Sequence, residues 1–397
     1  MFKSPFSQIL VFVGFIALFS CGEKASDEIY SGKLEELAIE DWILYKDIET
    51  PNIQYLKTIP DQDDVVILTS GLSDNSGMVI KFYDILTSKK SLQIKIPYEG
   101  PQSIKGGMGG RILVCDLNSI LLFGRTGRLG FYDTLGHKTK EIGIDSILKE
   151  DIVDFDNFMY GSVMLMSNEN WLLVNQNPSK TTFDNSSRLW KADFPVEFKN
   201  WFTQINLKTG EIRHSDFKIP SGYESFKGDA FATNLIGALD SKRGYYYFSW
   251  PYSDVVYKLN NLSLEEEFIP ETKVNFTYIP GKETPWGEGF TVFAAPKEAS
   301  SHIFLLYDPY NDLLVRASKT HESGEGETKF ERTKHYVLSF YSGDWEPLGE
   351  YFFDFEGELD LENWFLTGGR LFINKPEQPN EDQYEFYRLD LSKIKKP

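Results

Sequence analysis

Val79-Ile80-Lys81-Phe82-Tyr83-Asp84 is the stretch that decides the fold, because variants of it recur along the chain. Each copy is a short run of β-branched, aliphatic or aromatic residues, which favour strands, and it ends in a small polar residue. The six copies are Val79–Asp84, Leu129–Asp133, Phe202–Asn206, Val256–Asn260, Val337–Ser342 and Phe386–Asp390. Asp or Asn closes five of them, and such residues initiate turns by bonding to their own backbone. The recurrence predicts a repeated unit of strand and turn.

Further apolar runs flank these copies. The preceding runs are Val65–Thr69, Ile120–Phe123, Trp171–Asn175, Tyr245–Trp250, Ile303–Tyr307 and Leu371–Asn374. Runs that follow a copy include Leu92–Pro97, Asp216–Pro220 and Glu267–Pro270, and the closing proline suits an outer edge strand. A local echo links Trp250-Pro251-Tyr252-Ser253-Asp254 with Asp308-Pro309-Tyr310-Asn311-Asp312. The pattern is typical of four-stranded blades.

The intervals between closing residues give the blade count and the insertions. They are 49, 73, 54, 82 and 48 residues, whereas a four-stranded blade needs roughly 40 to 50. The two long intervals predict insertions, which we place at 176–200 and 312–334. The sixth unit ends almost at the C-terminus, so we expect Lys33–Ile43 to supply its outer strand.

The predicted fold is therefore an all-β, six-bladed β-propeller in a single domain, residues 33–397, with the ring closed by N- and C-terminal strands. Seven blades is the alternative count, because Phe290–Ala294, which we assign as an inner strand, lies in a long interval. A β-sandwich with coincidental turns is the alternative fold.

The N-terminus predicts a lipid anchor. Lys3 precedes an apolar run, Ile9–Phe19, which is too short to span a membrane, and Ser20 then precedes Cys21. Leu18-Phe19-Ser20-Cys21 resembles the lipobox of bacterial lipoproteins, in which the cysteine is acylated. We expect residues 1–20 to be a signal peptide, Cys21 to carry lipid, and residues 21–32 to be a flexible polar tether. An ordinary secretory signal is the alternative.

Composition restricts the partners. The formal net charge is −18, which argues against binding nucleic acid or anionic lipid headgroups. We therefore expect the protein to contact the membrane only through its lipid. The expected location is the bacterial cell envelope, at the outer membrane, in either leaflet. Cys115 is the only other cysteine, so no disulfide is expected, and in its apolar run it is a small hydrophobe.

Motifs for catalysis or cofactor binding are weak. The five histidines are scattered, and Asp61–Asp64 and Asp154–Asn157 lack the glycine and glutamate of a calcium loop. The chain has no Gly-x-Ser-x-Gly motif, and no helix is predicted after the glycine-rich stretch at 106–110. We therefore predict no metal, no cofactor and no assigned catalytic residue, although the acidic residues are too numerous to exclude a carboxylate pair.

Ligand binding is the better-supported role. In propellers the loops between second and third strands, and between blades, line one face around the axis. We expect aromatic and basic residues on those loops to form a recognition surface. The candidates are Arg111, Arg188, Trp190, Trp250, Tyr252, Trp286, Tyr310, Arg316 and Lys375. The alternative for each aromatic is packing between blades.

Phe-Tyr-Asp strand ends in an acylated all-β chain, such as Phe131-Tyr132-Asp133, resemble an uncharacterised family of six-bladed, TolB-like propeller lipoproteins of Bacteroidetes. The resemblance implies a fold and a cell-envelope location, but no activity. Asp133-Thr134-Leu135 and Asp145-Ser146-Ile147 also resemble the O-glycosylation acceptor of Bacteroidetes, which would modify Thr134 or Ser146.

These observations favour a membrane-anchored, non-enzymatic propeller that binds a peptide or protein partner or a glycan. One alternative is a hydrolase or lyase acting on carbohydrate or lactone at the axial face. The other is a structural scaffold of an envelope complex. An axial pocket with converging carboxylates or histidines would favour the enzyme.

Overall fold

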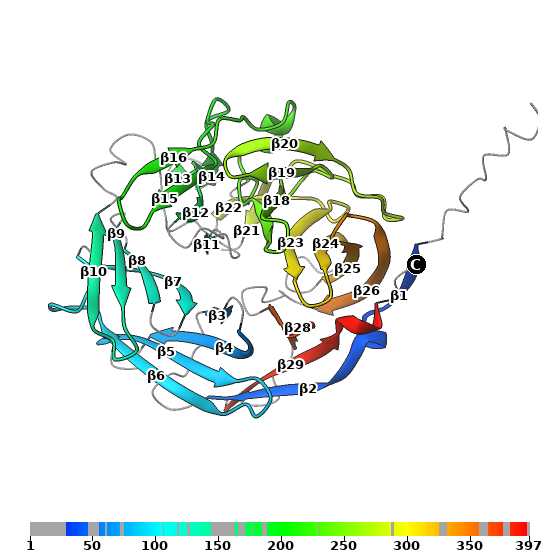
Figure 1. Cartoon of the computed structure of the whole chain (residues 1–397). Helices are drawn as coiled ribbons and strands as arrows, with labels where there is room; N and C mark the ends of the chain where they lie inside the picture. The colour runs from blue at the N-terminus through cyan, green and yellow to red at the C-terminus, as the bar shows by residue number, and fades with distance from the viewer. Residues whose placement is uncertain are drawn as a thin grey trace, which may run out of the picture.

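The computed structural model describes residues 29–46, 55–59, 62–71, 75–105, 107–116, 119–124, 128–143, 163–165, 171–176, 178–184, 189–229, 231–286, 290–324, 332–356, 364–375 and 382–394. This part of the chain is almost entirely β-structure, with only short 3-10 helices, η2 (Leu34–Leu37), η4 (Tyr223–Phe226) and η6 (Leu391–Lys393). The sheets are arranged radially around a central axis (Figure 1). The chain is an all-β propeller, as the repeated strand–turn unit predicted.

Five blades are each built from four strands taken in chain order, which pair antiparallel with their neighbours; only the third blade is interrupted, by β13 and β14. The first is β3 (Tyr55–Ile59), β4 (Gln62–Gly71), β5 (Gly77–Asp84) and β6 (Lys90–Pro97), and the second is β7 (Met108–Asp116), β8 (Ser119–Gly124), β9 (Arg128–Tyr132) and β10 (Lys138–Gly143). The third is β11 (Val163–Leu165), β12 (Trp171–Asn175), β15 (Phe202–Asn206) and β16 (Ile212–His214), and the fourth is β17 (Ile236–Asp240), β18 (Tyr245–Ser249), β19 (Val256–Asn260) and β20 (Ser263–Phe268). The fifth is β23 (Ser301–Asp308), β24 (Leu313–Ser323), β25 (Thr333–Ser342) and β26 (Pro347–Glu356).

The predicted outer strands are partly right. β6 ends at Pro97 and β20 ends at Phe268, close to the expected runs. Asp216–Pro220 forms no strand, because pairing in the third blade stops at His214. Ser215 intervenes there: its hydroxyl accepts a hydrogen bond of 3.0 Å from the amide of Phe202.

A further sheet joins the two ends of the described chain. It contains β27 (Phe365–Thr367), β28 (Arg370–Asn374), β29 (Gln383–Asp390) and β2 (Ala38–Tyr45). β2 pairs antiparallel with β29, with Trp42 opposite Phe386 (Figure 1). The predicted pairing of the N-terminal stretch with the last strand is confirmed. The strand begins only at Ala38, because Leu34–Leu37 forms η2.

Two side chains hold this closing strand. The indole Nε1 of Trp42 donates a buried hydrogen bond of 2.8 Å to the carbonyl of Ile85 in the next blade. The ammonium group of Lys375 lies 2.6 Å from Asp41 on β2 and 2.9 Å from Glu385 on β29. β2 is therefore tied both to its own sheet and to the neighbouring blade.

The flexible tether predicted for residues 21–32 does not extend to residue 32. Tyr30–Lys33 forms β1, which pairs in parallel with β26, and Ile29 before it is buried. The prediction of a flexible segment up to residue 32 is therefore wrong for its last residues. The predicted signal peptide, Cys21 and the first part of the tether lie outside the described residues, which begin at Ile29. Among the helices of the described chain, none is long and apolar enough to cross a membrane.

A seventh sheet stands outside the series of blades. It pairs the hairpin β13 (Lys180–Asp184) and β14 (Leu189–Asp193) with the hairpin β22 (Phe290–Ala294) and β21 (Lys282–Trp286), through a parallel contact between β14 and β22. The predicted insertion at 176–200 is confirmed, since it carries β13 and β14. Phe290–Ala294 is not the inner strand of a blade that we expected, because it belongs to this inserted sheet.

The second predicted insertion is misplaced. Leu313–Ser323, the first half of the predicted insertion, is the strand β24, which pairs along its length with β25 instead of forming a loop. The extra length lies between β20 and β23, at 269–300, where an irregular segment precedes β21 and β22. The polar composition near residue 322 misled the prediction, because β24 continues as a strand through Ser323 while pairing with β25 beyond the core.

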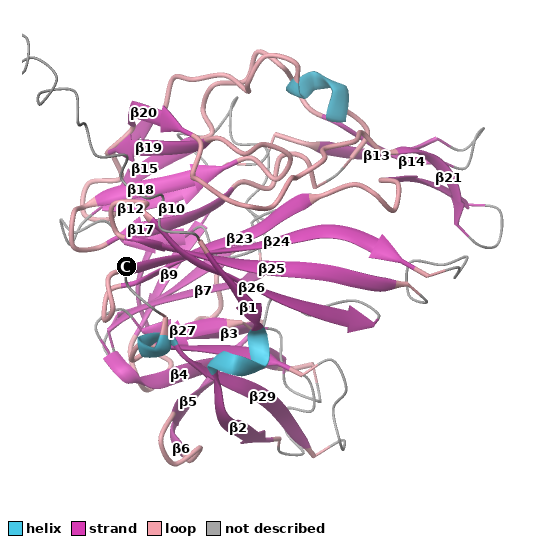
Figure 2. Cartoon of the chain, turned by 90° about the vertical axis from the view of Figure 1, so that its right-hand side faces the viewer, coloured by secondary structure: helices cyan, strands magenta, loops and turns pink. Residues whose placement is uncertain are grey.

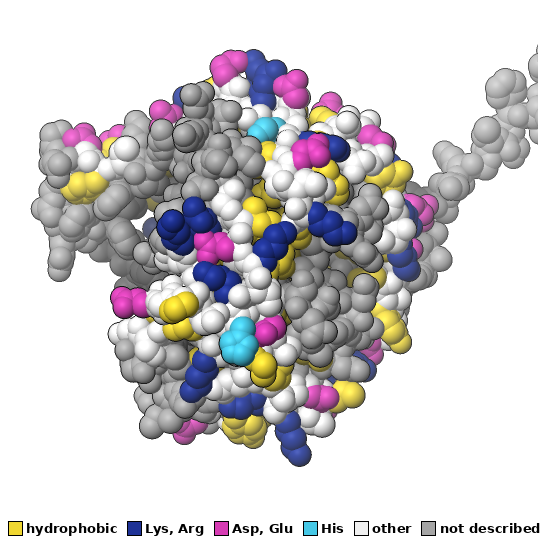
Figure 3. Space-filling model, turned by 60° about the vertical axis from the view of Figure 1, so that its left-hand side comes forward, with side chains coloured by type: hydrophobic (Ala, Val, Ile, Leu, Met, Phe, Trp, Pro, Cys, Tyr) yellow, Lys and Arg dark blue, Asp and Glu magenta, His cyan; other side chains and the backbone are white. Residues whose placement is uncertain are grey.

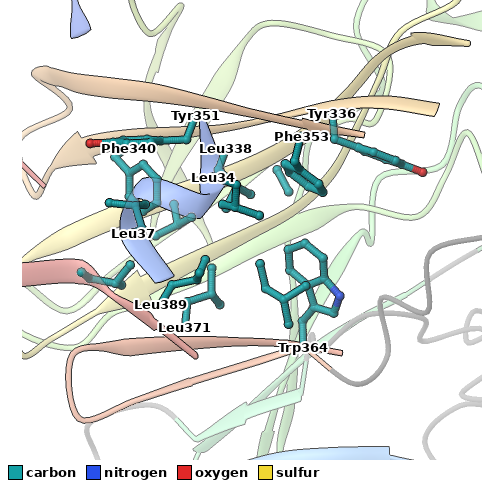
Figure 4. Packing of buried hydrophobic residues seen from close by; sticks show 14 of the residues in the cluster. Leu34, Leu37, Tyr336, Leu338, Phe340, Tyr351, Phe353, Trp364, Leu371 and Leu389 are labelled. Carbon is teal, nitrogen blue, oxygen red and sulfur yellow. The ribbon is translucent and has the colours of Figure 1, made fainter. Parts of the chain in front are cut away.

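The largest apolar cluster lies between the fifth blade and the closing sheet. Leu34 and Leu37 of η2 pack there against Leu338 of the fifth blade and Leu371 and Leu389 of the closing sheet (Figure 4). Burying a leucine side chain contributes roughly 1.5–3 kcal/mol. The N-terminal segment thus fills the space between two sheets, which explains why no disulfide is needed to hold the ring.

Charged side chains are mixed on the surface. In the view with the left side of Figure 1 turned forward, Lys and Arg alternate with Asp and Glu over the coloured residues (Figure 3). Ion pairs such as that of Arg128 with Glu141, at 2.9 Å, also join opposite charges in the described part of the chain. The net negative charge is therefore not gathered into one patch on the described part of this face.

Candidate ligand-binding face

Strand direction divides the connecting loops into two sets. Because neighbouring strands in a blade are antiparallel, the loops after second strands and between blades lie on one side, which we call the upper face. The turns after first and third strands lie on the opposite, lower face. β24, β25 and β26 and the sheet of β13, β14 and β21 extend toward the same side, at the right of Figure 2. The inserted structure therefore enlarges the upper face.

Trp250, a candidate on that face, is buried in the core. It is 1% exposed and packs edge-on against Trp201, with ring centroids 4.6 Å apart. Tyr223 of η4 covers its other side. The expectation that Trp250 is a loop residue available to a ligand is wrong, and it packs within an apolar cluster instead.

Tyr252 lies next to this cluster and is only half-buried. Its ring stacks on Phe226, and its hydroxyl donates a hydrogen bond of 2.5 Å to Asp229. Burial raises the pKa of Asp229 and also raises that of Tyr252. Tyr252 is thus held rigidly at the upper face by a stacked ring and a carboxylate.

Of two further candidates, one is paired with carboxylates and the other lies on the lower face. Lys375 follows β28 on the upper face, but its ammonium group is paired with Asp41 and Glu385. Tyr310 is 68% exposed and lies in the turn between β23 and β24, which is on the lower face. The sequence echo between the segments around Tyr252 and Tyr310 therefore joins turns on opposite faces.

Four candidates have no described side chain. Arg111 lies on β7, Trp190 on β14 and Trp286 on β21, so only their backbone positions are known. Trp190 and Trp286 both belong to the inserted sheet beyond the upper face. Arg188 lies outside the described residues, as does Ser146. Thr134 is described and half-buried in the turn after β9.

Arg316 is the remaining candidate, and it is buried without an ionic partner. It lies on β24 and is 1% exposed. Its Nη2 donates a hydrogen bond of 3.1 Å to the hydroxyl of Tyr341, whereas Nε and Nη1 have no hydrogen-bond partner among the described residues. The rings of Phe276 and Tyr341 lie 5.8 and 5.6 Å from the guanidinium carbon. A desolvated guanidinium with free donors is costly unless something binds it.

A second orphaned group lies in the same cross-strand row. Arg316 is opposite Ser339 on β25, and Ser339 is opposite Glu350 on β26, so the three side chains share one face of the sheet. Glu350 is 2% exposed, and its Oε2 has no hydrogen-bond partner in the described part of the chain. Its Oε1 accepts a hydrogen bond of 3.2 Å from the amide of Lys273. The row therefore offers unused donors at one end and an unused acceptor at the other.

An irregular segment, residues 269–281, covers this row. The hydroxyl of Thr272 and the amide of Lys273 donate hydrogen bonds to Glu350. The amide of Thr277 donates another, of 3.0 Å, to the hydroxyl of Ser300. Phe276, in the middle of the segment, lies over Arg316. We call residues 269–281 the covering segment. A ligand group that reaches Arg316 must pass or displace Phe276.

A buried chain of hydrogen bonds lies beside Arg316. The hydroxyl of Tyr278 donates to Asp254 at 2.6 Å, so it accepts from Nε2 of His302, 2.7 Å away. Nδ1 of His302 is then free to accept from the hydroxyl of Ser318 at 2.7 Å. Burial, with Arg316 nearby, lowers the pKa of His302 to about 4. The histidine is therefore neutral at pH 7 and adds no positive charge beside Arg316.

Asp254 supplies the nearest negative field. Burial alone would raise its pKa, but hydrogen bonds from His302 and Tyr278 outweigh burial and lower it. Asp254 is thus ionised, yet it makes no hydrogen bond or ion pair with Arg316 among the described residues. Within that same part of the chain, no cluster of three or more His, Cys, Asp or Glu side chains is arranged to hold a metal ion.

Several of these residues were not anticipated. Glu350, Asp254, Tyr278 and His302 come from four separate stretches of sequence, and of these only Asp254 stands in a repeated motif, the Trp250–Asp254 echo. Arg316 was found only because it is basic and was expected on an insertion. A charged residue inside the apolar run Leu313–Ala317 is the signal that could have shown that it is buried.

The chain is thus a β-propeller with a buried polar row beneath its covering segment. A sequence profile of the family described as Domain of unknown function (DUF4221) matches residues 43–351, so the chain belongs to that family. The crystal structure of a DUF4221 member from Bacteroides vulgatus superposes with a TM-score of 0.60 at 14% identity, over 88% of this chain and 96% of that one.

Other solved structures are more distant. A protein of unknown function from Bacteroides thetaiotaomicron has a TM-score of 0.42 at 12% identity, over 91% of this chain and 75% of that one. A luciferin-regenerating enzyme has a TM-score of 0.39 at 9% identity, over 88% and 95%. No curated protein sequence matches. The expectation of an uncharacterised propeller family is confirmed to the extent that the chain is a propeller of the DUF4221 family.

Proposed function

We propose that this chain is a lipid-anchored propeller of the bacterial cell envelope that binds a ligand carrying a carboxylate group at Arg316. The observation that carries the proposal is the buried row in which Arg316 Nε and Nη1 and Glu350 Oε2 have no partner among the described residues. Buried polar atoms in folded proteins are nearly always paired, by protein, water or ligand. The hydroxyl of Ser339 also has no partner among these residues, and four unpaired atoms in one row indicate a place for a polar molecule.

The chemistry of the row selects the ligand. A guanidinium with free donors binds carboxylate strongly, because the hydrogen bonds are charge-assisted. Glu350 Oε2, whose residue lies two strands away in the same row, accepts a donor such as a hydroxyl, amide or ammonium group. Phe276 and Tyr341 supply apolar walls. The C-terminal carboxylate of a peptide and the carboxylate of an acidic sugar both fit these requirements.

The position of β1 supports an arrangement in which this face points away from the membrane. Tyr30 pairs with Gly349, near the start of β26 and the turn from β25, and that turn belongs to the lower face. Tyr30, where β1 begins, therefore lies toward the side opposite the upper face. Acylated Cys21 would lie within about 30 Å of Tyr30. The upper face would then be open to the surrounding solution.

The number of blades and the type of propeller are also part of this proposal. We count the closing sheet of β2 and β27–β29 as a sixth blade, since it has four strands and combines both ends of the described chain. The inserted sheet is then an addition to the blades. A six-bladed, TolB-like lipoprotein of Bacteroidetes remains the type that we expect. Modification of Thr134, in an exposed turn of the lower face, would leave the upper face free.

Binding tests the proposal directly. The full chain, purified in mild detergent, is applied to arrays of peptides with free or amidated C-termini and to arrays of acidic and neutral glycans. We expect retention that depends on a carboxylate in one of the two arrays and that is lost in Arg316→Met. Retention without a carboxylate, or equal retention by both proteins, would reject this site.

The other candidate roles predict different results. If the row holds only ordered water, neither array will retain the protein, and a scaffold role in an envelope complex becomes the better account. A hydrolase or lyase acting at the axial face would release products from glycans during incubation. Mass spectrometry of the arrayed compounds distinguishes such turnover from binding.

A further inference from the structure

Three side chains at the rim of the upper face form a continuous relay. The hydroxyl of Ser323 lies 2.7 Å from Nε2 of His335, and Nδ1 of His335 lies 2.6 Å from Oδ1 of Asp354. They come from three adjacent strands, β24, β25 and β26, and His335 is directly opposite Asp354. His335 pairs with His321, and Ser323 lies two residues beyond His321, so it is on the same face of the sheet.

The hydrogen bonds are consistent with a single tautomer. An ionised carboxylate only accepts, so Nδ1 of His335 carries the proton that bonds to Asp354. Nε2 then has a free lone pair, which accepts the hydroxyl proton of Ser323. His335 is thus oriented as a general base, with Asp354 holding the imidazole and Ser323 in the position of a nucleophile.

Neighbouring residues hold the relay in place. The ring of His321 stacks on that of His335, with centroids 4.2 Å apart and planes inclined by 15°. The hydroxyl of Thr320 donates to the carbonyl of His335 at 3.1 Å, which fixes the backbone of that strand. Glu322, next to Ser323, is paired with Lys319 at 2.8 Å. These contacts keep the long strands aligned beyond the core.

The relay is also accessible. The side chain of His335 is 25% exposed and that of Asp354 is 63% exposed. Ser323 is the last residue of β24, and Gly324 after it has a φ of +97°, so the chain turns away at this point. The amide of Gly324 directly follows the serine, which is a position that supplies an oxyanion-binding N–H in other serine hydrolases.

We propose that Ser323, His335 and Asp354 form a site that hydrolyses small esters by acyl transfer. The oxygen of Ser323 forms a bond to the ester carbonyl carbon while its proton passes to Nε2 of His335. The bond to the alkoxy group breaks, and that group leaves as an alcohol with the proton from His335. Water then attacks the acyl-serine, again giving its proton to His335, and the carboxylic acid is released as Ser323 regains its proton.

Exposure limits the expected rate. In water the charge on Asp354 is screened, so it stabilises the imidazolium less than a buried carboxylate would. Activated esters with short acyl chains are therefore the suitable class of substrate. This site is separate from Arg316, and the proposal does not depend on ligand binding there.

Covalent labelling tests the site on the full chain in mild detergent. A fluorophosphonate probe should label Ser323, as identified by peptide mass spectrometry, and p-nitrophenyl acetate should be hydrolysed faster than in buffer. Ser323→Ala should abolish both. Asp354→Asn should lower the rate on the order of 10²-fold or more, because it favours the wrong tautomer.

Controls separate chemistry from folding. Ser225→Ala removes an exposed hydroxyl that bonds to the carbonyl of Gly222, and it should leave labelling and rate unchanged. Circular dichroism should show that the variants retain the β-structure of the parent. Labelling that is absent from Ser323, or Ser323→Ala hydrolysing as fast as the parent, would show that the relay is only a structural cross-strand contact.

Discussion

The guanidinium of Arg316 donates a 3.1 Å hydrogen bond to the hydroxyl of Tyr341, although both residues are about 1% exposed and no carboxylate pairs with the arginine among the described residues. Burial raises the pKa of Tyr341, with Arg316 acting against the rise, so the phenol is neutral at pH 7. The phenol therefore brings no negative charge to the guanidinium. This relationship is the basis of the binding account.

Replacing Arg316 should stabilise the free protein. Exchanging buried charge for apolar side chains of similar volume often stabilises by 1–4 kcal/mol, so Arg316→Met should raise the free energy of unfolding in urea by about 1–3 kcal/mol. Arg128→Met, which breaks a hydrogen-bonded ion pair with Glu141, should instead lower it. An Arg316→Met protein less stable than the parent by 2 kcal/mol or more would mean that the arginine is structural.

His302 should make stability depend on pH. Its pKa is lowered to about 4 in the fold, against an ordinary value near 6.5, so the unfolded chain binds the proton more readily between these two values. Stability is therefore fully present above about pH 6.5 and falls as pH drops toward 4, by up to roughly 3 kcal/mol. Urea denaturation at pH 7, 5.5 and 4.5 measures this loss.

A variant assigns the pH effect to His302. His302→Gln cannot take up the proton, so its stability should fall less between pH 7 and 4.5 than that of the parent. His137→Asn, at a side chain that is 61% exposed, should fall as steeply as the parent. If the His302 variant and the parent lose stability in parallel, the titrating group lies elsewhere.

The closing strand should be sensitive at Trp42. Trp42→Phe removes the hydrogen bond to Ile85 and leaves a buried carbonyl unpaired, which costs about 1–3 kcal/mol. Tyr45→Phe changes a residue on the same strand that is 60% exposed, and it should have little effect. Guanidinium denaturation of the two variants compares them, and equal midpoints would contradict the role assigned to the indole.

The proposed anchor predicts where the protein is found. With Cys21 acylated, the full chain should sediment with membranes and enter the detergent phase on partition. Cys21→Ala should move it to the soluble fraction, since no acyl chain can then be attached. A Cys21→Ala protein that still sediments with membranes after a high-salt wash would contradict lipid attachment at this residue.

Much of the fold followed from local sequence pattern. Strand runs ending in Asx residues reflect backbone and turn chemistry, which act within a few residues, so copies such as Val79–Asp84 and Val256–Asn260 were located closely. Pairing of the N-terminal stretch with Phe386–Asp390 followed from the missing outer strand of the last unit. Both inferences use information that lies within one repeat.

The face of a loop was harder to predict, because it depends on counting every strand. Ile303–Tyr307 was assigned as the second strand of its unit, whereas β23 is the innermost strand. Neighbouring strands are antiparallel, so an error of one strand moves the following turn to the opposite side. Tyr310 was misplaced for this reason alone.

The candidate sites depend on register, which short-range pattern does not carry. The row of Arg316, Ser339 and Glu350 needs the alignment of three strands, and the relay at Ser323 follows a register shift between Lys319 and His321. The covering segment brings Phe276 from another interval altogether. Such contacts arise from tertiary packing, so the sequence indicated an arginine but not its surroundings.

The central claim is that Arg316 binds a ligand carboxylate. Isothermal titration of the full chain with the best array compound, and with its amide or methyl ester, tests this claim most directly. We predict measurable heat for the acid, at least tenfold weaker binding for the neutral analogue, and no binding of the acid by Arg316→Met. Equal affinity for the acid and its neutral analogue, or undiminished binding by Arg316→Met, would contradict it.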